Sequence, residues 1–275
     1  MTHGIITFIG GGNMATSLIG GLINDGYTAN QICATDPLPA RRLQLSEQFG
    51  ITTFEDNSEA CAQAQVVVLA VKPQVMSVVV KPIGPTLAQT QPLVLSIAAG
   101  IPEPAISRWL GYDASVVRTM PNTPALVSSG ITGMFANARV SGSERSVADA
   151  IMKAVGETVW VQTEAEIDAV TAVSGSGPAY FFLLMELMAK TGEKLGLEPN
   201  AAQELALQTA LGAARIAIEG EDSPATLRQK VTSPGGTTER ALQIFQDGGM
   251  PQLVEDALTG ARDRAQELAD ELGQD

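Results

Sequence analysis

Cysteine and histidine are scarce in this chain of 275 residues, which has two cysteines, Cys33 and Cys61, and one histidine, His3. Neither cysteine belongs to a CxxC pair, so the sequence predicts no disulfide framework, and we expect no metal site. Unpaired cysteines in small number favour a reducing compartment. We therefore expect a cytoplasmic protein.

Positive charge and long apolar runs are also in short supply. Lysine and arginine number 17 against 30 acidic residues, the net charge is -13, and the basic residues form no block. Nucleic acid and anionic membranes are poor partners for such a chain, and we expect neither. Apolar runs such as AYFFLLM, before Glu186, are far shorter than the roughly 18 residues that span a bilayer. Nothing at the start of the sequence predicts a signal peptide.

Hydrophobic residues make up 45% of the chain, enough for a sizeable core. Up to residue 162, short apolar runs alternate with helical patterns, which predicts a doubly wound, mostly parallel sheet of Rossmann type. The predicted strands are Ile5–Ile9, Ile32–Asp36, Val66–Val71, Leu93–Ile97, Ser115–Thr119, Ile131–Phe135 and Thr158–Gln162.

The pattern changes after residue 162, and every later segment is predicted to be helical. We expect an α/β domain over 1–162 and an all-helical domain over 163–275. Two helical stretches, AYFFLLMELM and LALQTALGAARIAI, are apolar on most faces and need cover. A second copy of the chain would provide it, so we expect a homodimer; the alternative is a compact bundle with a deep core.

The segment ITFIGGGNMA has the form of a dinucleotide-binding turn between a strand and a helix. Gly10 permits the tight turn, Gly12 lets the backbone approach a diphosphate, and Ala15 is small enough for the helix to pack on the strand. The free N–H groups at the start of the helix would face the phosphates.

The second predicted strand ends in ATDPLPARR, which carries conflicting signals. Asp36 stands where an acidic residue holds the adenosine ribose of NAD. Arg41 and Arg42 follow, and an arginine there can accept the 2′-phosphate of NADP, although a solvated helix face explains them equally well. Lys72 ends another strand, where it could approach a phosphate or a ribose.

A second glycine turn, SPGGTT, lies more than two hundred residues further along the chain. Gly235 and Gly236 could direct successive backbone N–H groups at an anion, and Thr237 and Thr238 then open a helix. A plain turn between two helices is the alternative. Because the single histidine is terminal, the commonest general acid is missing, which favours reduction of a cationic C=N group over a ketone, although lysines and tyrosines remain available as acids.

These residues resemble those of the pyrroline-5-carboxylate reductase family. The resemblance covers nearly the whole chain and depends on FIGGGNMA, VLAVKPQVM, LSIAAGI, RTMPNTPALV, VSGSGPAYFFLLMELM and LRQKVTSPGGTTERAL. It implies reduction of L-1-pyrroline-5-carboxylate to L-proline with NADPH or NADH, the last step of proline biosynthesis. It also implies a homodimer built by the helical domain, and dimers that assemble further into rings of five.

The resemblance implies roles for individual residues. The substrate pocket would comprise Ser176, Gly177, Ser233, Gly235, Gly236, Thr237 and Thr238, with the Thr238 hydroxyl as the catalytic contact to the ring nitrogen. The cofactor would meet Gly10, Gly12, Asn13, Met14, Thr35, Asp36, Asn57, Ala70, Val71, Lys72, Pro73, Ala98, Ala99, Gly100, Asn122 and Pro124. Asp36 departs from the small hydroxyl or amide usual in members that prefer NADPH.

Three other functions stay open at this point. A reductase of another cyclic imino acid would share the same features. A β-hydroxyacid dehydrogenase has the same architecture. Such enzymes resemble one another in a catalytic lysine at the start of the long helix, whereas the first lysine here, Lys190, comes about three turns later. A dinucleotide-sensing protein without turnover would have no need of the second glycine turn.

Overall fold

The computed structural model describes residues 4–274, which pack as two units. The described residues of unit 1 are 4–176 and 260–274, and unit 2 is 177–259. This division differs from the sequence boundary after residue 162. Helix α7 (Glu166–Val170) packs on the sheet, and the end of α12 (Met250–Leu272) returns to it, with Leu268 beside Gly100.

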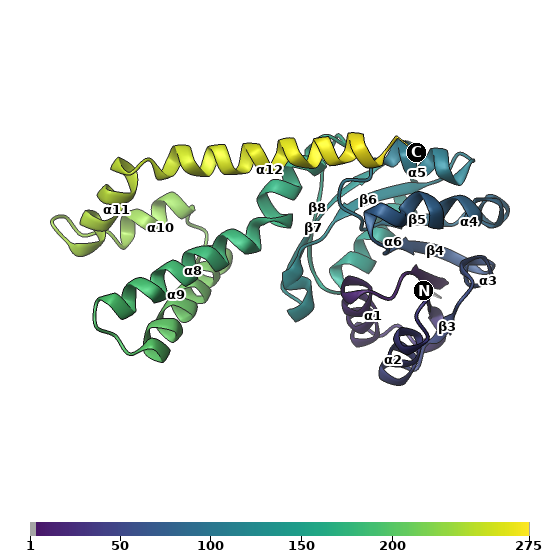
Figure 1. Cartoon of the computed structure of the whole chain (residues 1–275), viewed down its shortest axis with the longest axis horizontal. Coiled ribbons are helices and arrows are strands. Elements are labelled where there is room, and N and C mark those ends of the chain that lie inside the picture. The colour runs from purple at the N-terminus through teal and green to yellow at the C-terminus, as the bar shows by residue number, and fades with distance from the viewer. Residues whose placement is uncertain (1–3, 275) are drawn as a thin grey trace. The chain divides into compact units, whose positions relative to one another are not determined.

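Unit 1 contains an eight-stranded sheet in the order β3-β2-β1-β4-β5-β6-β7-β8 (Figure 1). All neighbouring strands are parallel except β6 and β7, so the predicted doubly wound, mostly parallel sheet is confirmed. The strands are β1 Ile5–Ile9, β2 Ile32–Thr35, β3 Thr52–Phe54, β4 Ala64–Leu69, β5 Leu93–Ser96, β6 Val116–Met120, β7 Gly130–Ala136 and β8 Gly156–Trp160.

The sheet contains one strand that was not predicted, and every predicted strand except β1 has one or both ends shifted by one or two residues. β3 was not predicted, because its three residues are exposed or half-buried and form no apolar run. β4 ends at Leu69 rather than at Val71. Beyond it the chain turns, since Pro73 opens the 3-10 turn η2 (Pro73–Val75).

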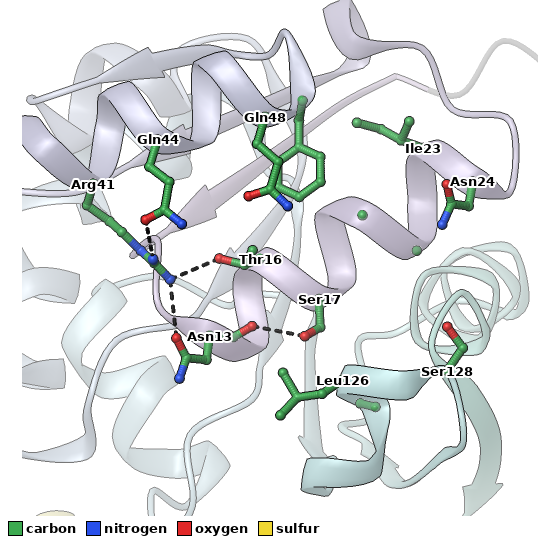
Figure 2. A pocket seen from close by; sticks show the side chains of 14 residues that line it. Asn13, Thr16, Ser17, Ile23, Asn24, Arg41, Gln44, Gln48, Leu126 and Ser128 are labelled. Carbon is green, nitrogen blue, oxygen red and sulfur yellow. Dashed lines mark hydrogen bonds between the residues drawn. The ribbon is translucent and has the colours of Figure 1, made fainter.

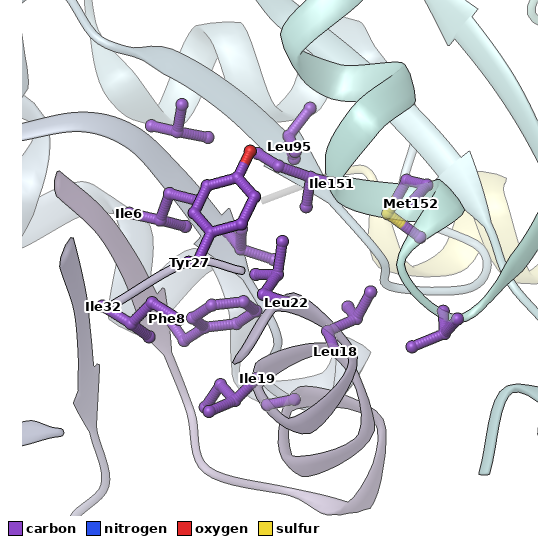
Figure 3. Close-up of a cluster of buried hydrophobic side chains, with 14 of the residues drawn as sticks. Ile6, Phe8, Leu18, Ile19, Leu22, Tyr27, Ile32, Leu95, Ile151 and Met152 are labelled. Carbon is purple, nitrogen blue, oxygen red and sulfur yellow. The ribbon is translucent and has the colours of Figure 1, made fainter. Parts of the chain in front are cut away.

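Helices cover both faces of the sheet. On one face α1 and α6 pack on the strands through Leu18, Ile19, Leu22, Ile151 and Met152 (Figure 3). On the other face α4 and α5 form a second core with β4 and β5. The helical segments before residue 160 are α1 Asn13–Asn24, η1 Ala29–Gln31, α2 Pro39–Phe49, α3 Asn57–Cys61, α4 Met76–Thr90, α5 Glu103–Leu110, η3 Thr123–Val127 and α6 Gly142–Lys153.

All regular elements after Trp160 are helical across the described residues, which confirms the predicted helical C-terminal region. Besides α7 and α12 they are the π-turn η4 Thr171–Gly175, α8 Gly177–Lys194, α9 Pro199–Glu219, α10 Pro224–Lys230 and α11 Thr237–Asp247. α8 packs on α9. Yet the outer faces are apolar: Phe181 and Phe182 are 63% and 62% exposed.

One continuous helix, Glu166–Lys194, is long and apolar enough to cross a membrane by length and composition alone. It comprises α7, the π-turn and α8, and its most apolar 18-residue window has a mean hydropathy of 1.2. This is weak evidence for a span, because a helix that is covered in a water-soluble assembly has the same composition.

Candidate functional site

The first glycine turn lies at the carboxyl ends of β1 and β4, where the strand order reverses direction. Gly10 adopts a left-handed φ of 101°, and its N–H donates to the Thr35 carbonyl at 3.0 Å. A Cβ at Gly10 would lie 2.8 Å from the Ala70 carbonyl oxygen. Only glycine fits this corner, which lies at the edge of a doubly wound sheet that binds ligands.

Gly12 begins helix α1 and leaves space in front of it. It is the N-cap residue, and no side chain accepts from the first helical N–H groups. A Cβ built on Gly12 would meet no atom within 4 Å, whereas Ala15 is buried against the strand. Asn13 and Met14 form the first turn of the helix. An open helix N-terminus of this shape fits the diphosphate of a dinucleotide.

Asp36 lies beside this turn. Its carboxylate accepts from the N–H of Gly11 at 3.1 Å and from the N–H of Leu38 at 2.9 Å. Thr35 precedes it at the end of β2 and pairs with Phe54 of β3, shortly before Asn57 opens α3. The three residues predicted to meet the adenosine, Thr35, Asp36 and Asn57, therefore lie near one another.

Both candidate arginines are already engaged by the protein. The Arg41 guanidinium donates to the Gly11 carbonyl and, at 3.0 Å, to the Thr16 hydroxyl, in a groove along α1 (Figure 2). The Arg42 guanidinium donates to the Asp36 carbonyl at 2.7 Å and pairs with Glu55 at 2.9 Å. Sequence reasoning placed both residues near the ribose but could not foresee these partners.

The strands β4 and β5 deliver the next predicted residues to the same edge. The Ala70 N–H donates to the Ile9 carbonyl at 2.8 Å, which places the segment 70–73 next to the glycine turn. In that segment Val71 and Pro73 are half-buried and Lys72 is exposed. Ala98 and Gly100 are buried after β5, while Ala99 is exposed.

The loop after β6 meets the helix that follows the sheet. Asn122, 8% exposed, donates from its Nδ2 to the Ser174 carbonyl at 3.2 Å, and its Oδ1 accepts from the Ile131 N–H at 3.0 Å. Pro124 follows in η3. The structure thus brings two motifs of the sequence together, MPNTP and SGSGP, of which Ser176 belongs to unit 1 and Gly177 to unit 2.

A buried arginine in β6 was not anticipated from the sequence. The Arg118 side chain is 3% exposed and pairs with Glu164 at 3.0 Å and with Asp168 at 3.3 Å. Its Nε has no hydrogen-bond partner. Glu164 lies just before α7 and Asp168 lies within it, so the two ion pairs connect that helix to the sheet.

The second glycine turn lies in unit 2. The Gly236 N–H donates to the Ser233 carbonyl at 3.0 Å, and Gly235 has a φ of 70°. Proline followed by a left-handed glycine is typical of a type II turn. Gly236 is the N-cap of α11, and no side-chain hydrogen bond is made by this cap residue. Thr237 and Thr238 are the first two residues of the helix.

The Gly235 N–H is occupied within the turn. It donates to Glu239 Oε2 at 2.7 Å, a carboxylate three residues into its own helix. The assignment of Ser233–Thr238 to a substrate carboxylate stays a prediction. Among residues 4–274, no group of three or more His, Cys, Asp and Glu side chains converges as a metal site requires.

Sheet, glycine turn and open helix N-terminus define the class as a dinucleotide-dependent oxidoreductase of Rossmann type. The family model described as "NADP oxidoreductase coenzyme F420-dependent" matches residues 5–100, and "Pyrroline-5-carboxylate reductase dimerisation" matches 164–268. The chain is 54% identical to a pyrroline-5-carboxylate reductase of Pseudomonas aeruginosa over 269 residues, 98% of each chain. It belongs to the pyrroline-5-carboxylate reductase family.

Solved structures agree with this assignment. The pyrroline-5-carboxylate reductase of Coxiella burnetii is 46% identical, with a TM-score of 0.94 over 98% of this chain and 99% of that one. The Plasmodium falciparum pyrroline carboxylate reductase, solved with NADP bound, is 26% identical, with a TM-score of 0.86 over 98% and 99%. The chain is accordingly an NAD(P)H-dependent oxidoreductase, and its dimerisation domain indicates self-association.

Proposed function

We propose that this protein reduces L-1-pyrroline-5-carboxylate to L-proline with NADH or NADPH, the last step of proline biosynthesis. Family membership supports this reaction, and the observation that carries it is the presence of two separate glycine turns, one opening α1 and one opening α11. A dinucleotide needs the first. The second glycine turn would bind the carboxylate of a small substrate.

The residues around the first turn fit the cofactor. We assign the diphosphate to the backbone at Gly10, Gly12, Asn13 and Met14, where a Cβ on Gly12 would fill the space. The adenosine side is assigned to Thr35, Asp36 and Asn57. The nicotinamide side is assigned to Ala70, Val71, Lys72, Pro73, Ala98, Ala99, Gly100, Asn122 and Pro124. When bound, the reduced nicotinamide supplies the hydride.

The α11 turn is assigned to the substrate. The N–H groups of Thr237 and Thr238 lie at a helix N-terminus, which attracts a carboxylate. The N–H of Gly236, also assigned to the substrate, donates to the Ser233 carbonyl at 3.0 Å and would have to exchange that partner for the ligand. The Thr238 hydroxyl is assigned to a hydrogen bond with the ring nitrogen, which would orient the imine. Ser176 and Gly177, of the segment Ser174–Pro178, are assigned to the wall of the pocket, and Ser233 is assigned to the substrate turn. A protonated imine is already cationic, so its reduction requires no strong general acid, in keeping with a single, terminal histidine.

The assembly is proposed to be a homodimer of the helical domain, with dimers joined further into a ring of five, in the cytoplasm. The dimerisation domain and the exposed apolar faces of α8 and α9 support the dimer. Light scattering on the purified protein measures the mass of the particle. A monomeric mass would contradict the dimer, and a dimeric mass would contradict the ring.

The reaction is tested by following the NAD(P)H absorbance band with added L-1-pyrroline-5-carboxylate. Absence of oxidation with both cofactors would reject the reductase and leave a dinucleotide sensor. Faster oxidation of NAD(P)H with a six-membered cyclic imino acid would change the substrate assignment, and so would reduction of the oxidised cofactor by a β-hydroxyacid. A crystal grown with proline should show the ligand carboxylate at the α11 turn.

A further inference from the structure

The long helix Glu166–Lys194 is irregular where it leaves the sheet. The Ser176 N–H donates to the Thr171 carbonyl at 2.8 Å, five residues back, and Thr171–Gly175 form a π-turn. In an α-helix the Ser174 carbonyl would accept from the N–H of residue 178. That residue is Pro178, which has no N–H. The helix therefore cannot satisfy this carbonyl in the regular way.

Asn122 supplies a donor to that carbonyl. Its Nδ2 lies 3.2 Å from the Ser174 oxygen, and its Oδ1 lies 3.0 Å from the Ile131 nitrogen. Because the Ile131 N–H can only donate, the amide oxygen must face it, and the NH2 group must face Ser174. The side chain is 8% exposed, so water has little access to replace either bond.

The surrounding packing leaves the π-turn little room to move independently. A Cβ on Gly175 would lie 2.5 Å from Met120 Cε, and a Cβ on Gly133 would lie 2.4 Å from Val170 Cγ1. The π-turn therefore packs closely on the last residue of β6, and the end of α7 packs closely on β7.

We infer that Asn122 is a positioning residue: its carboxamide replaces the donor that Pro178 lacks and fixes the wall Ser174–Ser176 beside the loop Met120–Pro124. This rests on the proposed reductase function, in which that wall faces the substrate. This role is an alternative to the cofactor contact assigned to Asn122 above: each end of its amide has one protein partner, and the NADH titration described below distinguishes the two roles. The π-turn is a common device at functional sites.

The test replaces Asn122 by aspartate, which keeps the acceptor for Ile131, removes the donor to Ser174 and adds a negative charge facing the Ser174 carbonyl oxygen. We expect kcat/KM for L-1-pyrroline-5-carboxylate to fall by about tenfold or more, while the Kd for NADH, from fluorescence titration, stays within about twofold. Amide hydrogen exchange across 171–176 should accelerate in the same variant. Asn137→Asp is the control for the added charge: Asn137 Nδ2 donates to the Ala114 carbonyl at 3.0 Å and to Glu103 Oε1 at 2.8 Å, away from both motifs, so this variant also places a carboxylate against an acceptor.

A double-mutant cycle with Pro178→Ala separates positioning from general damage. Alanine restores an N–H at residue 178, so Asn122→Asp should cost less in the Pro178→Ala background than in the wild type. Equal costs in the two backgrounds would overturn the inference. So would a Kd for NADH that rises in step with the loss of kcat/KM, because Asn122 would then be a cofactor ligand.

Failure of the proposed function is distinguishable from failure of this inference. If the wild-type protein does not turn over L-1-pyrroline-5-carboxylate, the reductase assignment is lost. Hydrogen exchange and NADH titration still report on Asn122 in that case. Unchanged exchange across 171–176 in Asn122→Asp would overturn the positioning role by itself.

Discussion

The backbone N–H of Gly235 is held by the carboxylate of Glu239, with Oε2 at 2.7 Å from the nitrogen. Glu239 is the third residue of α11, so its charge lies at the positive end of the helix and stabilises it by about 0.3–1 kcal/mol. The same charge lies next to the amides assigned to the substrate carboxylate. It therefore competes with the ligand that this turn is proposed to bind.

Replacing Glu239 by glutamine keeps an acceptor for Gly235 and removes the charge. We expect the KM for L-1-pyrroline-5-carboxylate to fall by about two- to fivefold at low salt, with a smaller difference at high salt because exposed charges are screened. Steady-state kinetics at two ionic strengths measure this. Glu255→Gln, at an exposed acid of α12, is the control. A raised KM would mean that the carboxylate shapes the turn instead of opposing the substrate.

Thr238→Ala removes the hydroxyl assigned to the ring nitrogen. We expect kcat to fall by about 100-fold, in the range typical of a lost proton or hydrogen-bond contact in the transition state, with the Kd for NADH unchanged. Stopped-flow turnover and fluorescence titration give the two quantities. Thr238→Ser should retain most of the rate, and an alanine variant with wild-type kcat would remove Thr238 from the mechanism.

Asp36→Ser should raise the ratio of kcat/KM for NADPH over NADH by about tenfold, because a carboxylate beside the ribose repels a 2′-phosphate. Kinetics with both cofactors measure the ratio. Glu55→Gln releases Arg42 from its ion pair without touching Asp36, and we expect a smaller shift. An unaltered ratio in Asp36→Ser would show that this side chain does not face the ribose.

Gly12→Ala and Gly10→Ala should separate binding from folding. Gly12 has a φ of -66° and open space at its Cβ, so alanine should leave the thermal midpoint unchanged and raise the Kd for NADH about tenfold or more. Gly10 has a φ of 101° and a backbone oxygen 2.8 Å from its Cβ, so alanine there should lower the midpoint itself. Calorimetry and titration check both; tight NADH binding by Gly12→Ala would contradict the assignment.

Arg118→Met should destabilise unit 1 by about 3–5 kcal/mol, since it leaves two carboxylates without their buried partner. Urea unfolding followed by circular dichroism measures the loss. Arg139→Met is the comparison: Arg139 is 58% exposed and pairs with Asp113, so its loss should cost less than about 1 kcal/mol. Similar losses in the two variants would show that burial does not matter here.

The alternation of apolar runs and helical patterns was enough to predict the sheet, because strands covered on both faces must be apolar throughout. Strand β3 was not predicted, because its side chains are exposed or half-buried and form no apolar run. The glutamate of the α11 turn could have been found, since an acid at the third helical position often reaches back to the N-terminus. The hydrogen bond of Asn122 to the Ser174 carbonyl could not have been found in this way, because the two residues are 52 positions apart and no local sequence rule joins them.

Unit 2 has almost no interior of its own. Among its hydrophobic residues, all of which the structure describes, Ala202 and Ala206 alone are buried. Two methyl groups cannot offset the conformational entropy of ordering five helical segments. We therefore expect the folding of this unit to require a second copy of the chain, so that its yield depends on how much newly made chain is present. On this basis we expect a truncated or inactive copy that keeps these helices to pair with an intact chain as readily as a second intact chain does, and so to lower the activity of the assembly.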